Sequence, residues 1–126
     1  MAASVGLKSS MLNDITIQMV VTGYPTGAHL ISFINSTFPT ATFRHVFWDF
    51  SDASLAMMEV SEFESTEAAA RQYSEARGPD LKTAVLLANS ADVLLIRAYS
   101  AMTLKLKPMA MKASTDRREL LDWLGV

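Results

Sequence analysis

The chain has 126 residues, of which 50% are hydrophobic and 19% are charged. This composition is typical of a folded domain and excludes a disordered chain. A net charge of −2 excludes a general basic surface for nucleic acid. Because cysteine is absent, disulfides, thiolate metal sites and cysteine nucleophiles are excluded as well.

No apolar run is long enough to span a bilayer, and residues 1–10 hold no apolar stretch of signal-peptide length. We therefore expect one cytoplasmic domain over residues 1–126. Residues 1–12 are expected to form a short N-terminal strand or to stay partly disordered.

Apolar and polar residues alternate over 15–22, which predicts a half-buried strand. Asn13 and Asp14 before it predict a turn, so that residues 5–11 pair back on this strand as a hairpin. A helix is predicted over 26–38, between Thr26 as N-cap and Pro39, which cannot continue a helix. Its apolar stripe consists of Leu30, Ile31, Ile34 and Phe38.

The nearly continuous aromatic segment 43–50 is typical of a central strand that is covered on both faces. Ser61 and Glu64 have the spacing of a capping box, which predicts a helix from there to Arg77, before Gly78 and Pro79. Segment 82–88 predicts the next strand.

A third helix is predicted from Ser90 to about Met102. Its predicted buried side chains are Leu94, Leu95, Ala98 and Met102. Segment 108–113 predicts a short edge strand, because Pro108 cannot donate to a ladder. A final helix is predicted after the cap pair Asp116 and Glu119, and the side chains expected to dock it are Leu120, Trp123 and Leu124.

Strands that alternate with helices predict an α/β fold with a mostly parallel sheet of four to five strands and about four helices. The N-terminal hairpin makes that sheet mixed. Three stretches, in their order and spacing, resemble SpoIIAA-like (STAS-like) domains, the fold of anti-sigma-factor antagonists. They are V-V-T-G-Y-P-T at 20–26, F-W-D-F-S at 47–51, and the C-terminal series T-A-V-L-L-A, I-R-A-Y-S-A-M and D-W-L. The resemblance covers most of 15–124 and implies a bacterial, non-enzymatic regulatory or protein-interaction module.

One departure from the family pattern concerns phosphorylation. In regulatory members, a phosphorylated Ser follows the strand end within an Asp-Ser pair, but Met57 and Met58 stand at the corresponding places here. Ser51, Ser54 and Ser61 lie nearby without matching the motif. No phosphorylation site is therefore assigned, and switching by a partner kinase is not expected.

Asp49 and Ser51 are placed at the carboxyl end of a central strand, where ligands bind in open α/β sheets. The alternative is that Asp49 and Asp52 bind local backbone N–H groups only. His45 is either a ligand or pH-sensitive group, or, as the more favoured alternative, a hydrogen-bonded structural residue. Because no serine is tied to a histidine, we expect no enzyme, no catalytic residue, no cofactor and no metal site.

The remaining candidates form a surface for a ligand or partner: Leu55, Met57, Met58, Phe63, Arg97 and Tyr99. Methionine-rich segments suit varied apolar partners, although ordinary core filling is the favoured alternative. Arg97 either binds an anion or forms a surface ion pair. We expect a homodimer that contacts a protein partner, or else a carrier or sensor of a small apolar or amphiphilic ligand. Lys105, Lys107 and Lys112 either touch an anionic membrane surface or, as the favoured alternative, form a solvated edge.

Overall fold

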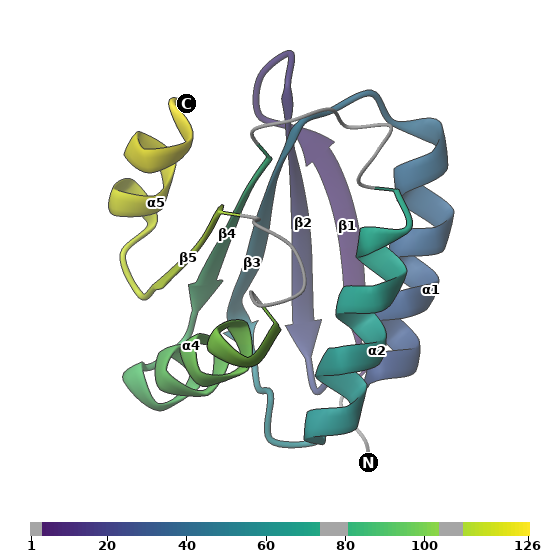
Figure 1. Ribbon diagram of the computed structural model, residues 1–126, viewed down its shortest axis with the longest axis vertical. Helices are drawn as coiled ribbons and strands as arrows, with labels where there is room; N and C mark the ends of the chain where they lie inside the picture. Colours follow the sequence, from purple (N-terminus) through teal and green to yellow (C-terminus); the bar gives the residue numbers. More distant parts are fainter. Residues whose placement is uncertain (1–3, 74–80, 104–109) are drawn as a thin grey trace.

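A mixed sheet of five strands in the order β1-β2-β3-β4-β5 forms the middle of the protein (Figure 1). The computed structural model describes residues 4–73, 81–103 and 110–126. The strands are β1 (Gly6–Met11), β2 (Thr16–Gly23), β3 (His45–Ala53), β4 (Lys82–Leu87) and β5 (Ala110–Ser114). The helices are α1 (Gly27–Thr37), the short 3-10 helix η1 (Phe38–Thr40), α2 (Val60–Arg71), α4 (Ser90–Thr103) and α5 (Arg117–Leu124).

β1 pairs antiparallel with β2, and the other three neighbouring pairs are parallel. The turn between β1 and β2 is held by Asn13, whose side-chain oxygen accepts the N–H of Ile15 at 3.0 Å. β5 forms the opposite edge, as predicted, whereas Pro108 lies outside the described residues. The predicted fold class, a mixed and mostly parallel α/β sheet, is therefore confirmed.

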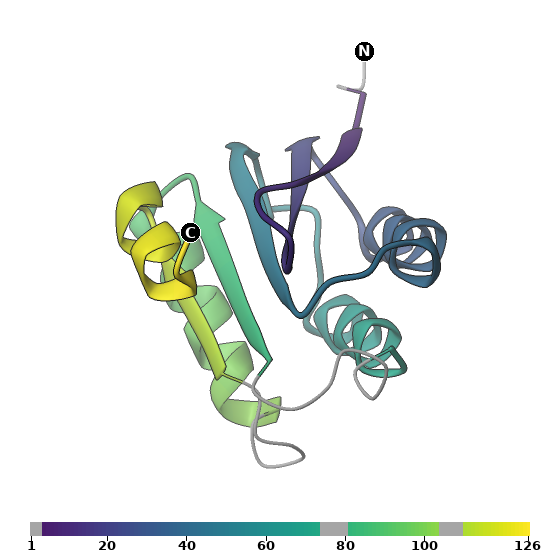
Figure 2. The same cartoon turned by 90° about the horizontal axis from the view of Figure 1, so that it is seen from above.

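The sheet separates two apolar cores of unequal size. The larger core lies between the sheet and helices α1, α2 and α4, and β3 contributes Val46, Trp48 and Phe50 to it. The smaller core lies under α5 and consists of Phe47, Ala84, Leu86, Leu120 and Leu124. Because neighbouring side chains of a strand point to opposite faces, β3 is covered on both sides, as its aromatic sequence predicted. Both views place α5 at the far side of β4 and β5 from α1 and α2 (Figure 2).

Helix α2 begins one residue before the predicted capping box, with a different pair of capping residues. Glu59 is its N-cap, and the carboxylate of Glu62 accepts the N–H of Glu59 at 2.8 Å. The other carboxylate oxygen of Glu62 accepts the N–H of Gly27 at 3.0 Å, so one side chain joins the starts of α1 and α2. The prediction of a Ser61–Glu64 box was wrong because this bond between helices selects Glu62. The predicted end of the helix at Arg77 lies outside the described residues.

Helix α4 buries a different face from the predicted one. Its buried side chains are Val93, Ile96 and Tyr99, whereas Leu94 is 65% exposed and Leu95 is 37% exposed. Ala98 is also exposed, and the side chain of Met102 is not described. Both stripes have helical spacing, so periodicity alone left the choice of face open. The buried stripe includes the aromatic side chain of Tyr99 and packs into the larger core.

Candidate functional site

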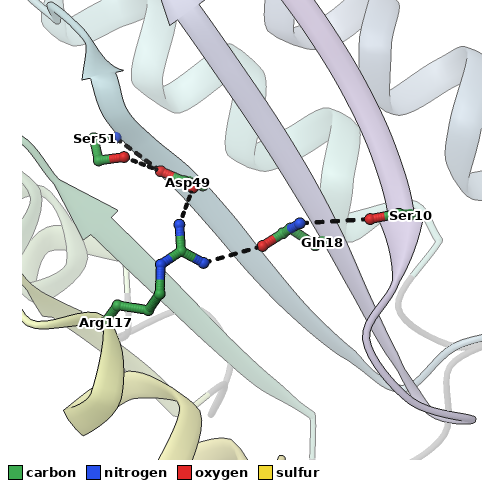
Figure 3. A network of polar contacts seen from close by, with 5 residues as sticks. All are labelled: Ser10, Gln18, Asp49, Ser51 and Arg117. Atoms are coloured by element: carbon green, nitrogen blue, oxygen red, sulfur yellow. Dashed lines mark hydrogen bonds and ion pairs between the residues drawn. The ribbon is translucent and has the colours of Figure 1, made fainter.

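A chain of polar contacts crosses the face of the sheet that α5 covers (Figure 3). Asp49 on β3 is 6% exposed. One of its carboxylate oxygens accepts the backbone N–H of Ser51 at 2.9 Å and the Ser51 hydroxyl at 2.5 Å. Asp49 therefore makes the local backbone contact that the alternative interpretation of the sequence predicted, whereas Asp52 is exposed.

The second carboxylate oxygen of Asp49 is bound by Arg117, the first residue of α5. The other terminal nitrogen of Arg117 donates to the side-chain oxygen of Gln18 at 3.2 Å, and Gln18 donates to Ser10 at 3.4 Å. The guanidinium also lies 5.3 Å from the ring centre of Phe47. The network thus joins α5 to β1, β2 and β3, and sequence reasoning missed Arg117 and Gln18.

The pKa of Asp49 reflects these contacts. Burial alone would raise it, but the hydrogen bonds from Ser51 and the guanidinium of Arg117 outweigh burial and hold the pKa below its usual range. Asp49 therefore stays ionised at neutral pH with both oxygens occupied by groups of the same chain. Such a carboxylate suits a structural tie between sheet and helix better than a general base.

The two histidines have structural contacts. Nδ1 of His45, which is 9% exposed, accepts the backbone N–H of Lys82, the first residue of β4, at 3.1 Å. Nδ1 of His29 accepts the N–H of Thr26 at 3.0 Å and thereby caps α1. For His45 this is the hydrogen-bonded structural role that was the favoured alternative.

Arg97 and Tyr99 point to different surroundings although both lie on α4. Arg97 donates to the carbonyl oxygen of Ala113 at 3.3 Å. The Tyr99 hydroxyl is buried and donates to the carbonyl oxygen of Phe63 at 2.6 Å, which connects α4 to α2. Burial, followed by the nearby carboxylates of Glu67 and Glu64, raises the pKa of Tyr99.

The methionine-rich segment after β3 is split between core and surface. Leu55 is 2% exposed and Met58 is 9% exposed, so both fill the core, whereas Met57 is 62% exposed. Two further apolar side chains at this end of the sheet, Tyr24 at 51% and Val60 at 55%, are also exposed. Sequence reasoning included Val60 in the apolar segment 55–60 but did not select Tyr24, although the Gly23-Tyr24-Pro25 turn places a large apolar residue in a loop.

Backbone contacts bring the loops that carry these residues to one edge. The N–H of Ser54 donates to the carbonyl oxygen of Gly23 at 2.8 Å, directly beside Tyr24. Glu62 in the first turn of α2 binds the start of α1. We call Tyr24, Met57 and Val60 the carboxyl-edge patch, because they lie where the parallel strands β2 and β3 end.

A separate cavity of about 100 Å³ lies between the sheet and the three helices of the larger core. Its lining includes the predicted site residues Leu55, Phe63 and Tyr99. The described residues Met57 and Met58 are not part of the lining. The structure therefore separates the predicted surface into two places: the exposed edge around Met57 and the cavity against Phe63.

The part of the chain that the structure describes bears on metal-ligand clusters and on membrane-spanning helices. His, Asp and Glu side chains there do not gather in groups of three or more that could hold a metal ion. Within the same residue ranges, none of the helices has both the length and the apolar character that crossing a bilayer requires.

Comparisons with known proteins bear on the fold. No protein-family model matches the chain, and no curated protein matches it in sequence. The solved structures that are similar include the following three. An uncharacterised DUF3478-family protein with a SpoIIAA-like fold from Shewanella loihica PV-4 has 13% identity and a TM-score of 0.57, with 96% of this chain and 92% of that chain covered. The anti-sigma factor antagonist SpoIIAA in its unphosphorylated form has 12% identity and a TM-score of 0.58, with 95% and 98% covered.

The Bacillus cell fate determinant SpoIIAA in its phosphorylated form has 15% identity and a TM-score of 0.58, with 94% of this chain and 99% of that chain covered. Identities this low carry the fold and not the site. The agreement extends over nearly the whole of each chain and matches the resemblance that the sequence stretches predicted. The chain has the SpoIIAA-like, or STAS-like, fold.

Proposed function

We propose that this protein is a non-enzymatic, cytoplasmic interaction module that binds a protein partner through the carboxyl-edge patch. The observation that carries the proposal is the exposure of Tyr24 and Met57 in the loops after β2 and β3, which a backbone bond from Ser54 to Gly23 joins, and of Val60 at the start of α2. Large apolar side chains gathered at a surface mark interaction sites more often than chance. Tyrosine and methionine are also among the residues enriched in protein interfaces.

The charges around the patch indicate the kind of partner. Segments 23–30 and 51–64 contain four acidic residues, Asp52, Glu59, Glu62 and Glu64, and no lysine or arginine. Of these, Asp52, Glu59 and Glu64 are exposed. A partner with an apolar centre and a basic rim complements such a surface, and charge complementarity sets its orientation and speeds its association.

The polar groups support the absence of catalysis. Asp49 is occupied by Ser51 and Arg117, and Nδ1 of His45 accepts a backbone N–H. These were the residues from which an enzyme would have had to be built. One of the compared structures is named as an anti-sigma factor antagonist, which is consistent with a fold that acts through protein contacts.

The proposed homodimer uses another surface, the exposed stripe of α4. This stripe consists of Ala91, Leu94, Leu95 and Ala98. It has the spacing of a helix–helix contact, and its small alanines allow close approach of a second copy. Sedimentation equilibrium of wild type and Leu94→Glu tests this: we expect a dimer for the wild type and a monomer for the variant. A wild-type monomer at 100-fold the working concentration would rule the dimer out.

Site-specific crosslinking tests the carboxyl-edge patch. A photoreactive phenylalanine analogue is placed at Met57 or, as control, at Ile15, which is 42% exposed and lies at the other end of β2. We expect one discrete crosslinked partner from position 57, lost when Val60→Asp is added and weakened by salt. Equal products from both positions, or no product from position 57, would contradict the proposal.

A further inference from the structure

We propose that the cavity between the sheet and helices α1, α2 and α4 binds a small neutral apolar molecule, of the size of one aromatic ring or a short hydrocarbon chain. This inference is independent of the partner surface, because core residues line the cavity, whereas the carboxyl-edge patch consists of exposed residues that do not line it. It also restricts the chemical class of the ligand, because the sequence suggested either an apolar or an amphiphilic molecule.

The size and lining of the cavity select the ligand. Its volume is about 100 Å³, which is below the range of about 300–1,000 Å³ for drug-sized ligands but near that of an engineered apolar cavity of about 150 Å³ that binds benzene. Trp48, Phe50 and Phe63 supply aromatic walls, with Val46 and Ile96 between them. A water molecule needs two to four polar partners, and these five side chains offer it none except the indole N–H of Trp48.

The polar groups of the lining are arranged so that they do not favour a polar ligand. Tyr99 lines the cavity, but its hydroxyl donates to the carbonyl oxygen of Phe63 at 2.6 Å. The Trp48 and Phe50 rings stack with centres 5.6 Å apart and 7° between their planes, so they present a flat apolar wall. The ligand therefore meets mainly ring faces and aliphatic groups, and the polar remainder of the lining consists of Thr66, Thr83 and Glu67. The Thr66 hydroxyl is occupied, because it donates to the carbonyl oxygen of Glu62 at 2.8 Å.

The charge of the lining excludes an anionic head group. Glu67 lines the cavity and pairs with Arg71 one turn further along α2. Within the described part of the chain, the lining includes no lysine, arginine or histidine. A carboxylate on the ligand would therefore face Glu67, whose charge already balances that of Arg71, and would lose its water without a cation of its own. We infer that neutral molecules bind and fatty-acid anions do not.

Cavity filling supplies a matched pair of variants on one helix. Ala70 lines the cavity, so Ala70→Leu places three additional carbon atoms in the space that the ligand would occupy. Ala68 on the same helix is exposed, so Ala68→Leu leaves the cavity unchanged and serves as the control. Both substitutions keep good helix formers.

Titrations followed by amide NMR, with benzene, 1-pentanol and pentanoate as probes, test the proposal. We expect benzene and pentanol to shift the amides of Phe63 and Tyr99, and pentanoate to bind at least 10-fold more weakly than pentanol. Ala70→Leu should weaken benzene binding at least 10-fold, and Ala68→Leu by less than 2-fold. If Ala70→Leu does not fold, xenon titration of the wild type replaces it, with shifts expected at the same amides.

Three results would overturn the proposal: shifts spread over surface amides, equal binding to both leucine variants, or pentanoate binding as strongly as pentanol. In the xenon experiment the overturning result is the absence of shifts around Phe63. None of these results bears on crosslinking at Met57, so failure of the cavity site and failure of the partner surface can be told apart.

Discussion

Removing the guanidinium of Arg117 should lower the free energy of unfolding. The loss should lie between the values typical of an exposed ion pair and of a buried ion pair. The Arg117 side chain is 46% exposed and that of Asp49 is 8% exposed. Exposed pairs contribute about 0.2–1 kcal/mol, and removing one partner of a buried pair costs about 3–5 kcal/mol. Because Asp49 keeps both hydrogen bonds from Ser51, we expect a cost of about 1.5 kcal/mol for Arg117→Ala.

The thermal consequence follows from the size of the domain. A change of 1 kcal/mol shifts the melting temperature by about 4–8 °C in domains of 60–100 residues and by about 2–4 °C in those of 150–250 residues. For this chain of 126 residues, Arg117→Ala should therefore lower the melting temperature by roughly 5–9 °C. Arg117→Lys should lie between wild type and Ala, because lysine keeps the charge but not the planar contact with two acceptors.

A double-mutant cycle separates the ion pair from the other contacts of Arg117. Urea unfolding of wild type, Asp49→Asn, Arg117→Ala and the double variant gives their coupling free energy, which we expect to be about 1 kcal/mol. The coupling should fall in 1 M salt, since one partner is half-exposed. A coupling below about 0.3 kcal/mol, within the usual error of additivity, would refute the view that this pair holds α5 on the sheet.

Three further predictions concern acid stability and the packing of α4. The stabilising contribution of Asp49 is complete above the unfolded-state pKa of about 3.9. Because the folded-state pKa is lowered, this contribution is lost as pH falls through that lower value. The urea midpoint should therefore fall more steeply below pH 4 in wild type than in Asp49→Asn, and parallel curves would contradict this. At protein concentrations at which the chain is monomeric, Ile96→Ala should cost about 2–4 kcal/mol in urea unfolding, and Leu94→Ala less than about 0.5 kcal/mol. The reverse order would mean that α4 buries the face predicted from the sequence. Tyr99→Phe should cost about 1–2 kcal/mol, because the carbonyl oxygen of Phe63 loses its buried donor, and unchanged unfolding would show that this bond does not hold α2 to α4.

The order of strands and helices could be predicted because each segment carries a local signal. The alternation over 15–22, the aromatic run at 43–50 and the cap at Asp116 each correspond to an element with nearly the predicted bounds. Asp116 accepts the N–H groups of Arg118 and Glu119, as its position before the helix implied. Signals of this kind depend on residues that are close in the sequence, so a single sequence is enough to detect them.

Features decided by distant contacts could not be predicted in this way. Arg117 binds Asp49 across 68 residues of chain, and nothing near either residue indicates the other. Glu62 caps α2 because it also binds Gly27, a residue of another helix. Helix α4 has two apolar stripes with helical spacing, and the stripe that contains Ile96 is buried because it packs on the sheet. The sequence analysis placed Asp49 and Ser51 at the carboxyl end of the strand, whereas β3 continues to Ala53 and Asp49 lies in its middle. The partners of Asp49 across the sheet were not predicted.

The placement of α5 also affects how the protein is made. Every strand that contributes to the smaller core precedes α5 in the chain, and Phe47, Ala84 and Leu86 obtain their cover from Leu120 and Leu124. Since domains generally fold from the N-terminal side during synthesis, this face of the sheet lacks its apolar cover until α5 has been made. Until α5 emerges, that bare face is where a chaperone would bind the nascent chain.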